Sequence, residues 1–182
     1  MNRFRGSIRR FANRDHMAFS ILLSIGLTAC NPFAPGLDEN LGGGSSLVGD
    51  PKTIDGVFQN IKFAYTFRDT VMYSQLLKSD YVYVFRDYER GVDVNWGRDE
   101  DLRITNGLFQ NVQRLDLVWN QIISISEDSL NTAAIVNRNF NLTVAFNPGQ
   151  IERVDGYVSL ALVRAVATEP WRILRWRDES NF

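Results

Sequence analysis

The sequence predicts one α+β domain in which helices pack on one face of a curved antiparallel sheet. Two patterns support this prediction. Over residues 54–111 apolar side chains recur mainly at helical spacing, whereas from Val112 onward they alternate with polar ones, as in strands with one buried face. The composition changes near residue 50, so the domain is expected to occupy residues 51–182.

The segment before the domain is expected to direct the chain to a membrane. Five arginines precede an apolar run of 13 residues, Met17–Ala29. A membrane-spanning helix needs about 20 apolar residues, so the shorter run is typical of a signal peptide, here over residues 1–29. The run ends in Leu27-Thr28-Ala29-Cys30, which resembles the lipobox of bacterial lipoproteins: an aliphatic residue, two small residues and a cysteine.

This resemblance implies lipidation of Cys30. It implies cleavage before Cys30, diacylglycerol on its thiol and acylation of the new amino terminus, and several acyl chains hold a protein firmly on a membrane. The expected location is the bacterial cell envelope, at the outer membrane or the periplasmic face of the inner membrane. Residues 30–50 are rich in Gly, Pro and Ser and are interpreted as a flexible tether. A general secretory signal with an incidental cysteine and a twin-arginine signal at Arg9-Arg10 are the alternatives.

The charge and residue types of the mature chain exclude several functions. Cleavage before Cys30 would leave 153 residues with 15 basic and 20 acidic side chains, and this acidic balance argues against a nucleic-acid partner. The only histidine, His16, would leave with the signal peptide, which excludes Ser-His-Asp and Cys-His catalysis and His/Cys zinc sites. No cofactor is therefore expected. A carboxylate site for calcium or magnesium stays open, although no EF-hand spacing occurs.

The first half of the domain predicts helices and one strand. Thr53 is a suitable N-cap for a helix over residues 54–67, and a shorter helix is expected over 71–77. Tyrosine and valine predominate over 80–86, which predicts a strand. The polar stretch 87–97 is interpreted as a loop.

A third helix and four strands complete the domain. The helix is expected to begin at Arg98, with acids in its first turn where the helix dipole favours negative charge. The strands are expected to form a meander, with a turn at Asn147-Pro148-Gly149, over about 115–125, 134–146, 158–166 and 171–178. In the last strand, side chains should alternate between the two faces, with Ile173 on one face and Trp176 on the other. A curled sheet with helices across it would enclose a pocket.

This order of elements resembles the nuclear transport factor 2-like fold, also called the ketosteroid-isomerase-like, SnoaL-like or cystatin-like cone. The resemblance covers roughly residues 53–179 and is carried by the stretches TIDGVFQNIKFAYTFRDTVMYSQLL, DYVYVF, WGRDEDLRITNGLF and WRILRWRD. It implies a cone-shaped domain and, by analogy, a homodimer through the outer sheet face. Ketosteroid-isomerase-like enzymes use a carboxylate base and an oxyanion hole of tyrosine and a protonated acid. No acid here stands inside an apolar stripe, so no catalytic residue is carried over.

Two arginines are candidate ligand-binding residues. Arg138 and Arg164 interrupt the apolar faces of neighbouring strands, and a turn near Ile151 would place them opposite each other. An anionic or carboxylate ligand could then lie between them. Alternatively, each arginine pairs with a local acid or extends its charged end into water at the rim of the sheet.

Two aromatic residues complete the candidate site. Tyr65 and Trp119 could face the pocket and contact a ligand. The alternative is that both fill the core between helices and sheet, as aromatic side chains of this size commonly do.

Two function classes stay open at this point. The favoured one is a lipid-anchored, non-enzymatic envelope protein whose cone binds a small apolar or anionic molecule or a partner protein. The alternative is a small enzyme of the isomerase, dehydratase or cyclase type that uses tyrosine and a carboxylate. A sealed apolar cavity would favour a structural role, and an open pocket with an acid of raised pKa beside a tyrosine would favour an enzyme.

Overall fold

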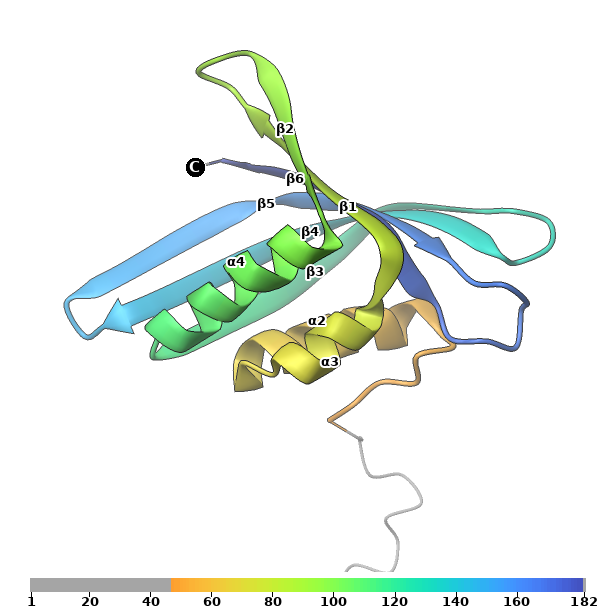
Figure 1. Cartoon of the computed structure of the whole chain (residues 1–182), viewed down its shortest axis with the longest axis horizontal. Coiled ribbons are helices and arrows are strands. Elements are labelled where there is room, and N and C mark those ends of the chain that lie inside the picture. The colour runs from red at the N-terminus through yellow and green to blue at the C-terminus, as the bar shows by residue number, and fades with distance from the viewer. Residues whose placement is uncertain (1–46, 182) are drawn as a thin grey trace, which may run out of the picture. The chain divides into compact units, whose positions relative to one another are not determined.

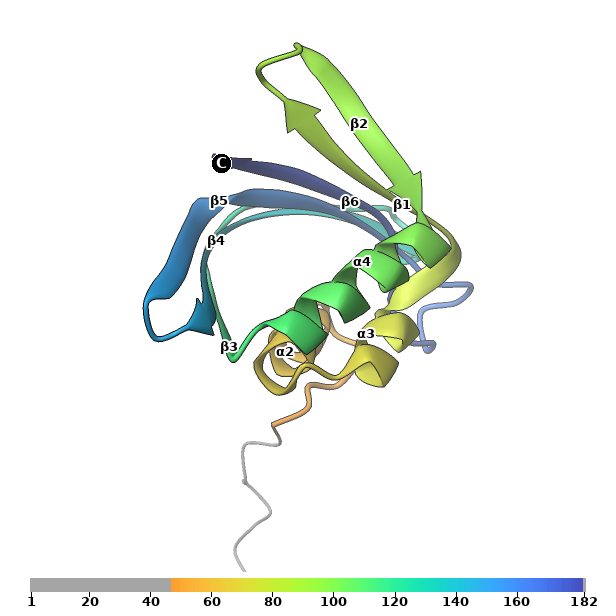
Figure 2. The ribbon, with the colours of Figure 1, turned by 60° about the vertical axis from the view of Figure 1, so that its left-hand side comes forward.

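Six strands form one curved sheet, and helices lie across its concave face (Figures 1 and 2). The computed structural model describes residues 47–181, so the predicted signal peptide, Cys30 and most of the predicted tether lie outside the described residues. The elements are, in chain order, α2 (Ile54–Phe67), α3 (Thr70–Leu76), β1 (Leu77–Asp87), β2 (Val92–Gly97), α4 (Arg98–Asn111), β3 (Arg114–Glu127), β4 (Ala133–Asn147), β5 (Gln150–Val163) and β6 (Arg172–Asn181). The predicted α+β arrangement is confirmed.

The strands follow the order β2-β1-β6-β5-β4-β3 across the sheet. Strands β3 to β6 pair antiparallel with their neighbours along the chain, which confirms the predicted meander. Strand β1 instead pairs parallel with β6, the last strand of the chain. This pairing joins the two ends of the domain, and local periodicity carries no signal for it.

Local side-chain caps explain where the first two helices begin. Thr53 accepts a hydrogen bond from the Gly56 amide at 2.9 Å, and α2 then has the bounds that the sequence predicted. Asp69 accepts from the Met72 amide at 2.9 Å and starts α3 in the same way. Arg68, in the left-handed conformation with φ 55°, ends α2 between them.

The apolar faces of α2 and α3 pack on the concave side of the sheet and form the main core. Its largest fully buried side chains come from α2, β1 and the long strands, and from the residue that precedes β6. They include Phe58, Ile61, Tyr81, Leu117, Leu160, Leu162, Trp171 and Ile173. A second, smaller buried cluster at the C-terminal end of α4 consists of Phe109, Val112, Leu115 and Val144.

The polar stretch 87–97 is not a loop, which corrects the sequence prediction. It contains β2, which pairs antiparallel with β1 and forms a hairpin that projects beyond the helices (Figure 2). Gly91 has φ 68°, a conformation that suits glycine and allows the tight turn before β2. The sequence did contain a strand pattern here, because Val92, Val94 and Trp96 alternate with an acidic and an amide residue.

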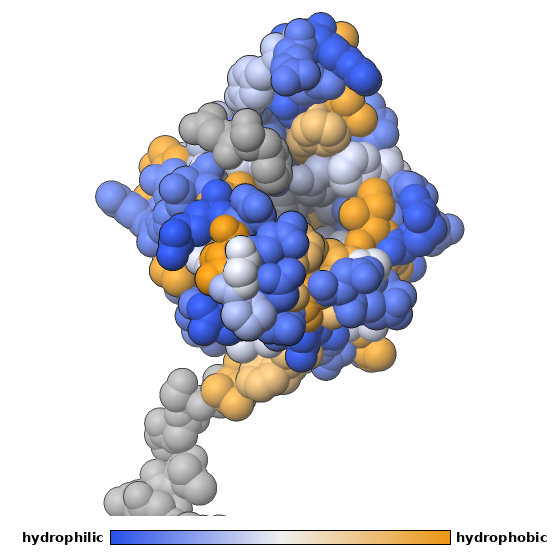
Figure 3. Space-filling model, turned by 90° about the vertical axis from the view of Figure 1, so that its left-hand side faces the viewer, coloured by the Kyte–Doolittle hydropathy of each residue, from blue (hydrophilic) through white to orange (hydrophobic). Residues whose placement is uncertain are grey.

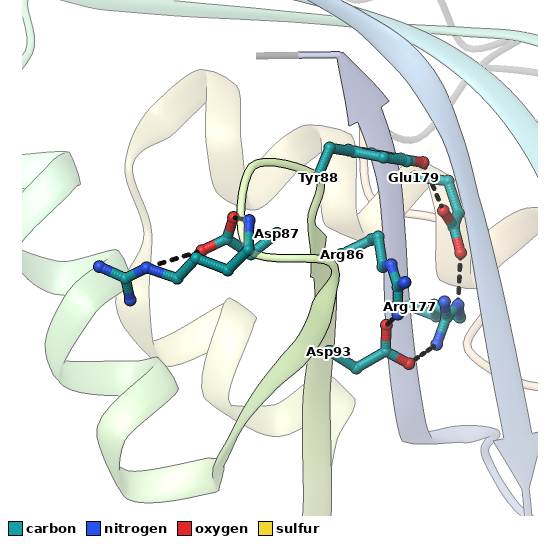
Figure 4. A network of polar contacts seen from close by, with 7 residues as sticks. Arg86, Asp87, Tyr88, Asp93, Arg177 and Glu179 are labelled. Atoms are coloured by element: carbon teal, nitrogen blue, oxygen red, sulfur yellow. Dashed lines mark hydrogen bonds and ion pairs between the residues drawn. The ribbon is translucent and has the colours of Figure 1, made fainter.

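Charged residues tie this hairpin to β6 on the outer face of the sheet (Figure 4). Asp93 of β2 accepts from Arg86 of β1 at 3.1 Å and from Arg177 of β6 at 2.8 Å. Arg177 also pairs with Glu179, which accepts from the Tyr88 hydroxyl at 3.1 Å. The two arginines and two acids balance each other, so this cluster fastens an edge hairpin and leaves no unpaired charge for a ligand.

A bulge in β6 corrects the predicted faces of the last strand. Leu162 pairs with Ile173, whereas Ala161 pairs with Arg175, so Leu174 is the extra residue. The extra residue places Ile173 and Trp176 on the same inner face, and both are buried. A strict alternation would have turned one of them outward.

The folded domain begins before the predicted boundary at residue 51. The buried Asn60 side chain of α2 accepts from the Gly49 amide at 2.7 Å and donates to the Gly49 carbonyl at 3.0 Å. Gly49 is itself buried. The last residues of the predicted tether are therefore packed against α2.

Candidate functional site

A pocket of about 560 Å³ opens between α4 and the concave face of the sheet. Much of its wall is apolar and comes from α4, β4 and β5: Ile104, Leu108, Phe140, Leu142, Val144, Phe146 and Val154. Glu152 and Arg153, which are exposed beside the β4–β5 turn, lie at its mouth. Figure 3 shows this end of the molecule, where apolar side chains lie among hydrophilic ones around a hollow.

Asp101 is the first of two carboxylates at the inner end of the pocket. It lies in the first turn of α4 and is only 3% exposed. Its Oδ2 accepts from the Tyr73 hydroxyl at 2.8 Å, and its Oδ1 accepts from Trp96 Nε1 at 2.9 Å. Burial raises the pKa of Asp101, while the hydrogen bonds from Trp96 and Tyr73 act in the opposite direction. Burial also raises the pKa of Tyr73 well above its ordinary value, so Tyr73 stays a neutral donor.

Asp178 of β6 is the second carboxylate. Its Oδ2 accepts from the Tyr83 hydroxyl at 2.8 Å, and its Oδ1 accepts from the Ser180 amide at 2.9 Å. Burial and the charge of Asp178 raise the pKa of Tyr83, so this phenol also stays protonated. The Tyr83 ring stacks on Trp96 with 4.5 Å between ring centroids and 16° between planes, which joins the two carboxylate clusters.

The sequence prediction that no acid stands inside an apolar stripe is therefore wrong. Asp101, Thr105 and Phe109 are all buried and follow one another at intervals of four on α4. This spacing was a usable signal, but acids in a first helical turn are more commonly exposed at the positive end of the helix dipole. Asp178 was missed because the bulge at Leu174 changes which residues of β6 face inward.

Tyr65, one of the candidate ligand-binding residues, is among the residues that line this pocket. Its ring packs edge-to-face against Tyr73, with centroids 6.1 Å apart, and against Phe109 at 5.5 Å. Burial raises the pKa of Tyr65 above its ordinary value, so it is neutral at physiological pH. Contact between Tyr65 and a ligand remains a prediction.

Trp119 and Arg138 line a different, smaller groove, of about 280 Å³, beside α2 and the edge strand β3. Trp119 donates its Nε1 proton to the Phe58 carbonyl at 2.8 Å and packs edge-to-face on the Phe58 ring. The guanidinium of Arg138 lies 4.9 Å from the centroid of the same ring and 3.7 Å from Asp55. Arg138 thus has a local acid, as the alternative interpretation proposed.

The predicted anion site shared by Arg138 and Arg164 is contradicted by the strand register. Arg138 pairs with Val158, six residues before Arg164, and this separation corresponds to about 20 Å along the strand. The register follows from the tight turn at Pro148–Gly149, because Asn147 pairs with Gln150. The turn centred on Ile151 that the shared site required does not form.

Arg164 has a structural environment of its own. Its guanidinium lies 4.0 Å from the centroid of the Trp171 ring. It donates to the Asn131 carbonyl at 2.8 Å, the Asn131 side chain at 2.7 Å, the Lys52 carbonyl at 3.1 Å and the Glu169 carbonyl at 3.4 Å. Arg164 therefore joins three loops, and it is not among the residues that line the two pockets described above.

The residues that the structure describes hold no cluster of three or more His, Cys, Asp or Glu side chains suited to a metal ion. The main pocket itself offers three kinds of contact. These are apolar contact, aromatic rings, and carboxylate and phenol oxygens.

The sequence matches no protein-family model and no curated protein, but solved structures are similar in fold. A conserved protein from Planctomyces limnophilus has a TM-score of 0.61 and 16% identity, with 70% of this chain and 93% of that one covered. A scytalone dehydratase-like protein from Novosphingobium aromaticivorans has a TM-score of 0.60 and 12% identity, covering 71% and 82%. A nuclear transport factor 2-like superfamily protein from Salmonella enterica has a TM-score of 0.57 and 14% identity, covering 72% and 91%.

These likenesses confirm the nuclear transport factor 2-like fold that the sequence predicted. One fold hosts many unrelated activities, so similarity to solved structures at such low sequence identities establishes the fold alone.

Proposed function

We propose that this chain is a lipid-anchored cell-envelope protein whose cone pocket binds a small, mainly apolar molecule. The observation that carries the proposal is the pocket itself. It has a volume of about 560 Å³, is open at one end, and combines an apolar wall with polar groups at its inner end. Small-molecule sites typically have volumes of about 300–1,000 Å³ and this same combination of lining groups.

The apolar wall would supply most of the binding free energy. Apolar surface removed from water contributes about 25 cal/mol per Å². The polar groups at the inner end would orient the ligand, because a few fixed hydrogen-bonding groups in an apolar pocket select both position and direction.

A pocket-filling substitution tests ligand binding. Ile104 lines the pocket on α4 and is 41% exposed, so a tryptophan at this position can enter the cavity without displacing the core. We expect the neutral dye Nile red to bind saturably to the wild-type domain, and Ile104→Trp to weaken this binding by about tenfold or more. The measurement is dye fluorescence during titration with protein.

The matched control is Ile135→Trp, which adds the same side chain at a 52% exposed position on β4, away from the pocket lining. Equal dye affinity in the two variants would place dye binding outside the cone and contradict the proposal.

Lipidation of Cys30 is the second part of the proposal. It is supported by the arginine-rich start, the apolar run and the lipobox-like Leu27-Thr28-Ala29-Cys30. Within residues 47–181, no helix is long and apolar enough to cross a bilayer. A lipid on Cys30 would hold the pocket close to a membrane surface.

Replacing Cys30 by serine should abolish the anchor, because the hydroxyl of serine does not replace the thiol that accepts the lipid. The expected product is an unprocessed or released protein that leaves the membrane fraction after washing with salt or alkali. Immunoblots of fractionated cells measure this, and Ser24→Ala within the apolar run is the control. If Cys30→Ser is cleaved normally and stays in washed membranes, the chain is not anchored through Cys30.

An acid–base enzyme of the dehydratase or isomerase type is the second candidate. It is favoured by Asp101, whose pKa is raised and which lies beside tyrosines in an open pocket. The fold similarity to a scytalone dehydratase-like protein is compatible with it. However, a general base needs an oxygen within reach of the substrate, and Asp101 is only 3% exposed, with Tyr73 and Trp96 hydrogen-bonded to its two oxygens. Binding is therefore the preferred function.

Mass spectrometry of molecules incubated with the protein separates the two candidates. A binding protein returns its ligand unchanged, whereas an enzyme converts it.

A further inference from the structure

We infer that the molecule bound in the cone pocket is a small organic cation, an amine in its ammonium form that carries an apolar body. This inference rests on the proposed binding function of the pocket and adds the chemical class of its ligand. Three features of the inner end support it: the use of its hydrogen-bond donors, the charge of its carboxylates and its aromatic lining.

The hydrogen-bond donors that contact the two carboxylates are already engaged, whereas Tyr65 and Thr105, which also line the pocket, keep hydroxyls with no assigned hydrogen bond within residues 47–181. Trp96 donates to Asp101 Oδ1, and Tyr73 donates to Asp101 Oδ2. Tyr83 donates to Asp178 Oδ2. The hydrogen-bonding capacity that remains on these carboxylates and phenols consists of acceptor lone pairs. A ligand that is complementary to these groups must supply the donors, as an ammonium group does.

The tyrosines that hold the carboxylates do not titrate in the physiological range. Burial is the largest cause that raises the pKa of Tyr73 and Tyr83, and the charge of the neighbouring aspartate adds to it. Tyr65 lines the same wall and is also neutral, and its hydroxyl has no hydrogen bond assigned to it in the described part of the chain. Tyr81 is a further buried tyrosine, but it does not line the pocket.

The charge at the inner end is negative. Across residues 47–181, neither Asp101 nor Asp178 takes part in an ion pair. At the mouth of the pocket Glu152 and Arg153 have opposite charges and offset each other. Carboxylates in a partly desolvated pocket favour a positively charged partner, because burial of an unpaired charge is unfavourable. An anionic ligand would be repelled from the same place.

Aromatic side chains surround these carboxylates. Tyr65, Tyr83 and Trp96 all line the pocket, and Tyr83 stacks on Trp96. Electron-rich aromatic rings attract organic cations, most strongly where water is excluded. The apolar wall beyond them, formed by residues such as Leu142 and Val144, would contact the body of the ligand.

Three probes of matched shape test the inference. They are 3-phenylpropylammonium, the neutral 3-phenylpropan-1-ol and the anionic 3-phenylpropionate, each titrated into the folded domain at neutral pH by isothermal titration calorimetry. We expect the cation to bind about tenfold or more tightly than the alcohol, and the anion to bind weakest.

A variant then assigns the selectivity to a carboxylate. Asp178→Asn removes the charge and keeps the size of the side chain, so it should reduce the affinity ratio of cation to alcohol to about threefold or less. The control is Asp155→Asn on the outer face, where Asp155 accepts from Asn141, and it should keep the wild-type ratio. If Asp178→Asn does not fold, as judged by circular dichroism, the ranking of the three probes on the wild-type domain still decides the inference.

The outcomes are distinguishable. Equal binding of the cation and the alcohol, or preferred binding of the anion, overturns the inference but leaves the proposed binding function standing. A full cation preference in Asp178→Asn also overturns the inference as stated. Failure of all three probes, together with failure of Nile red, would contradict the proposed function itself.

Discussion

Replacing Trp171 by alanine should reduce the free energy of unfolding by about 3–5 kcal/mol and leave the domain largely unfolded, because small domains have only about 5–15 kcal/mol of stability. Trp171 is 2% exposed and lies at the entry to β6. Its backbone amide donates to the Pro51 carbonyl at 2.9 Å, and its ring lies under the guanidinium of Arg164. Its loss would open a cavity and release the arginine that joins three loops.

Denaturant unfolding followed by circular dichroism measures this effect. The control is Val166→Ala, an exposed position in the loop that precedes Trp171. Trp176 is buried on the inner face of β6, so Trp176→Ala should lower the free energy of unfolding by a similar amount. Unfolding midpoints of both tryptophan variants close to that of Val166→Ala would contradict the packing of β6.

Replacing Gly56 by alanine should lower the free energy of unfolding by about 2–4 kcal/mol, because the new methyl group overpacks the site and buried hydrogen bonds are lost. A Cβ at this position would lie 1.8 Å from the Asp50 carbonyl oxygen and 2.8 Å from Thr53 Oγ1. The nearest obstacle is backbone, so the segment before α2 must move away. The paired hydrogen bonds between Gly49 and the buried Asn60 would then break.

Gly107→Ala is the matched control, because it places the same substitution in helix α4, where nothing lies within 4 Å of the new Cβ. It should stabilise the domain by about 0.5–1 kcal/mol, since alanine favours a helix and loses less backbone entropy than glycine. Thermal unfolding of the two variants measures the expected loss of stability in Gly56→Ala and the expected gain in Gly107→Ala. A neutral Gly56→Ala would show that the segment before α2 does not dock as described.

The parts of the fold that depend on neighbouring residues could be predicted from the sequence. Thr53 as N-cap and the helical spacing after it predicted α2 with its observed bounds. Alternation over the long strands and the Asn147-Pro148-Gly149 turn predicted the meander. These signals are local, because capping, turn chemistry and period act between residues a few positions apart.

Which polar residues form the site depends instead on contacts between distant segments of the chain. From the sequence, Asp101 resembles the acids that are commonly exposed in a first helical turn. In the structure, Tyr73 of α3 and Trp96 of β2 donate hydrogen bonds to it and bury it. The faces and the register of the strands also depend on pairing with other strands. In β6 one extra residue, Leu174, changes which side chains face inward. Between β4 and β5 the position of the turn sets the register that separates Arg138 from Arg164. Burial of a polar side chain depends on surfaces that distant segments bring together, so local pattern cannot show it.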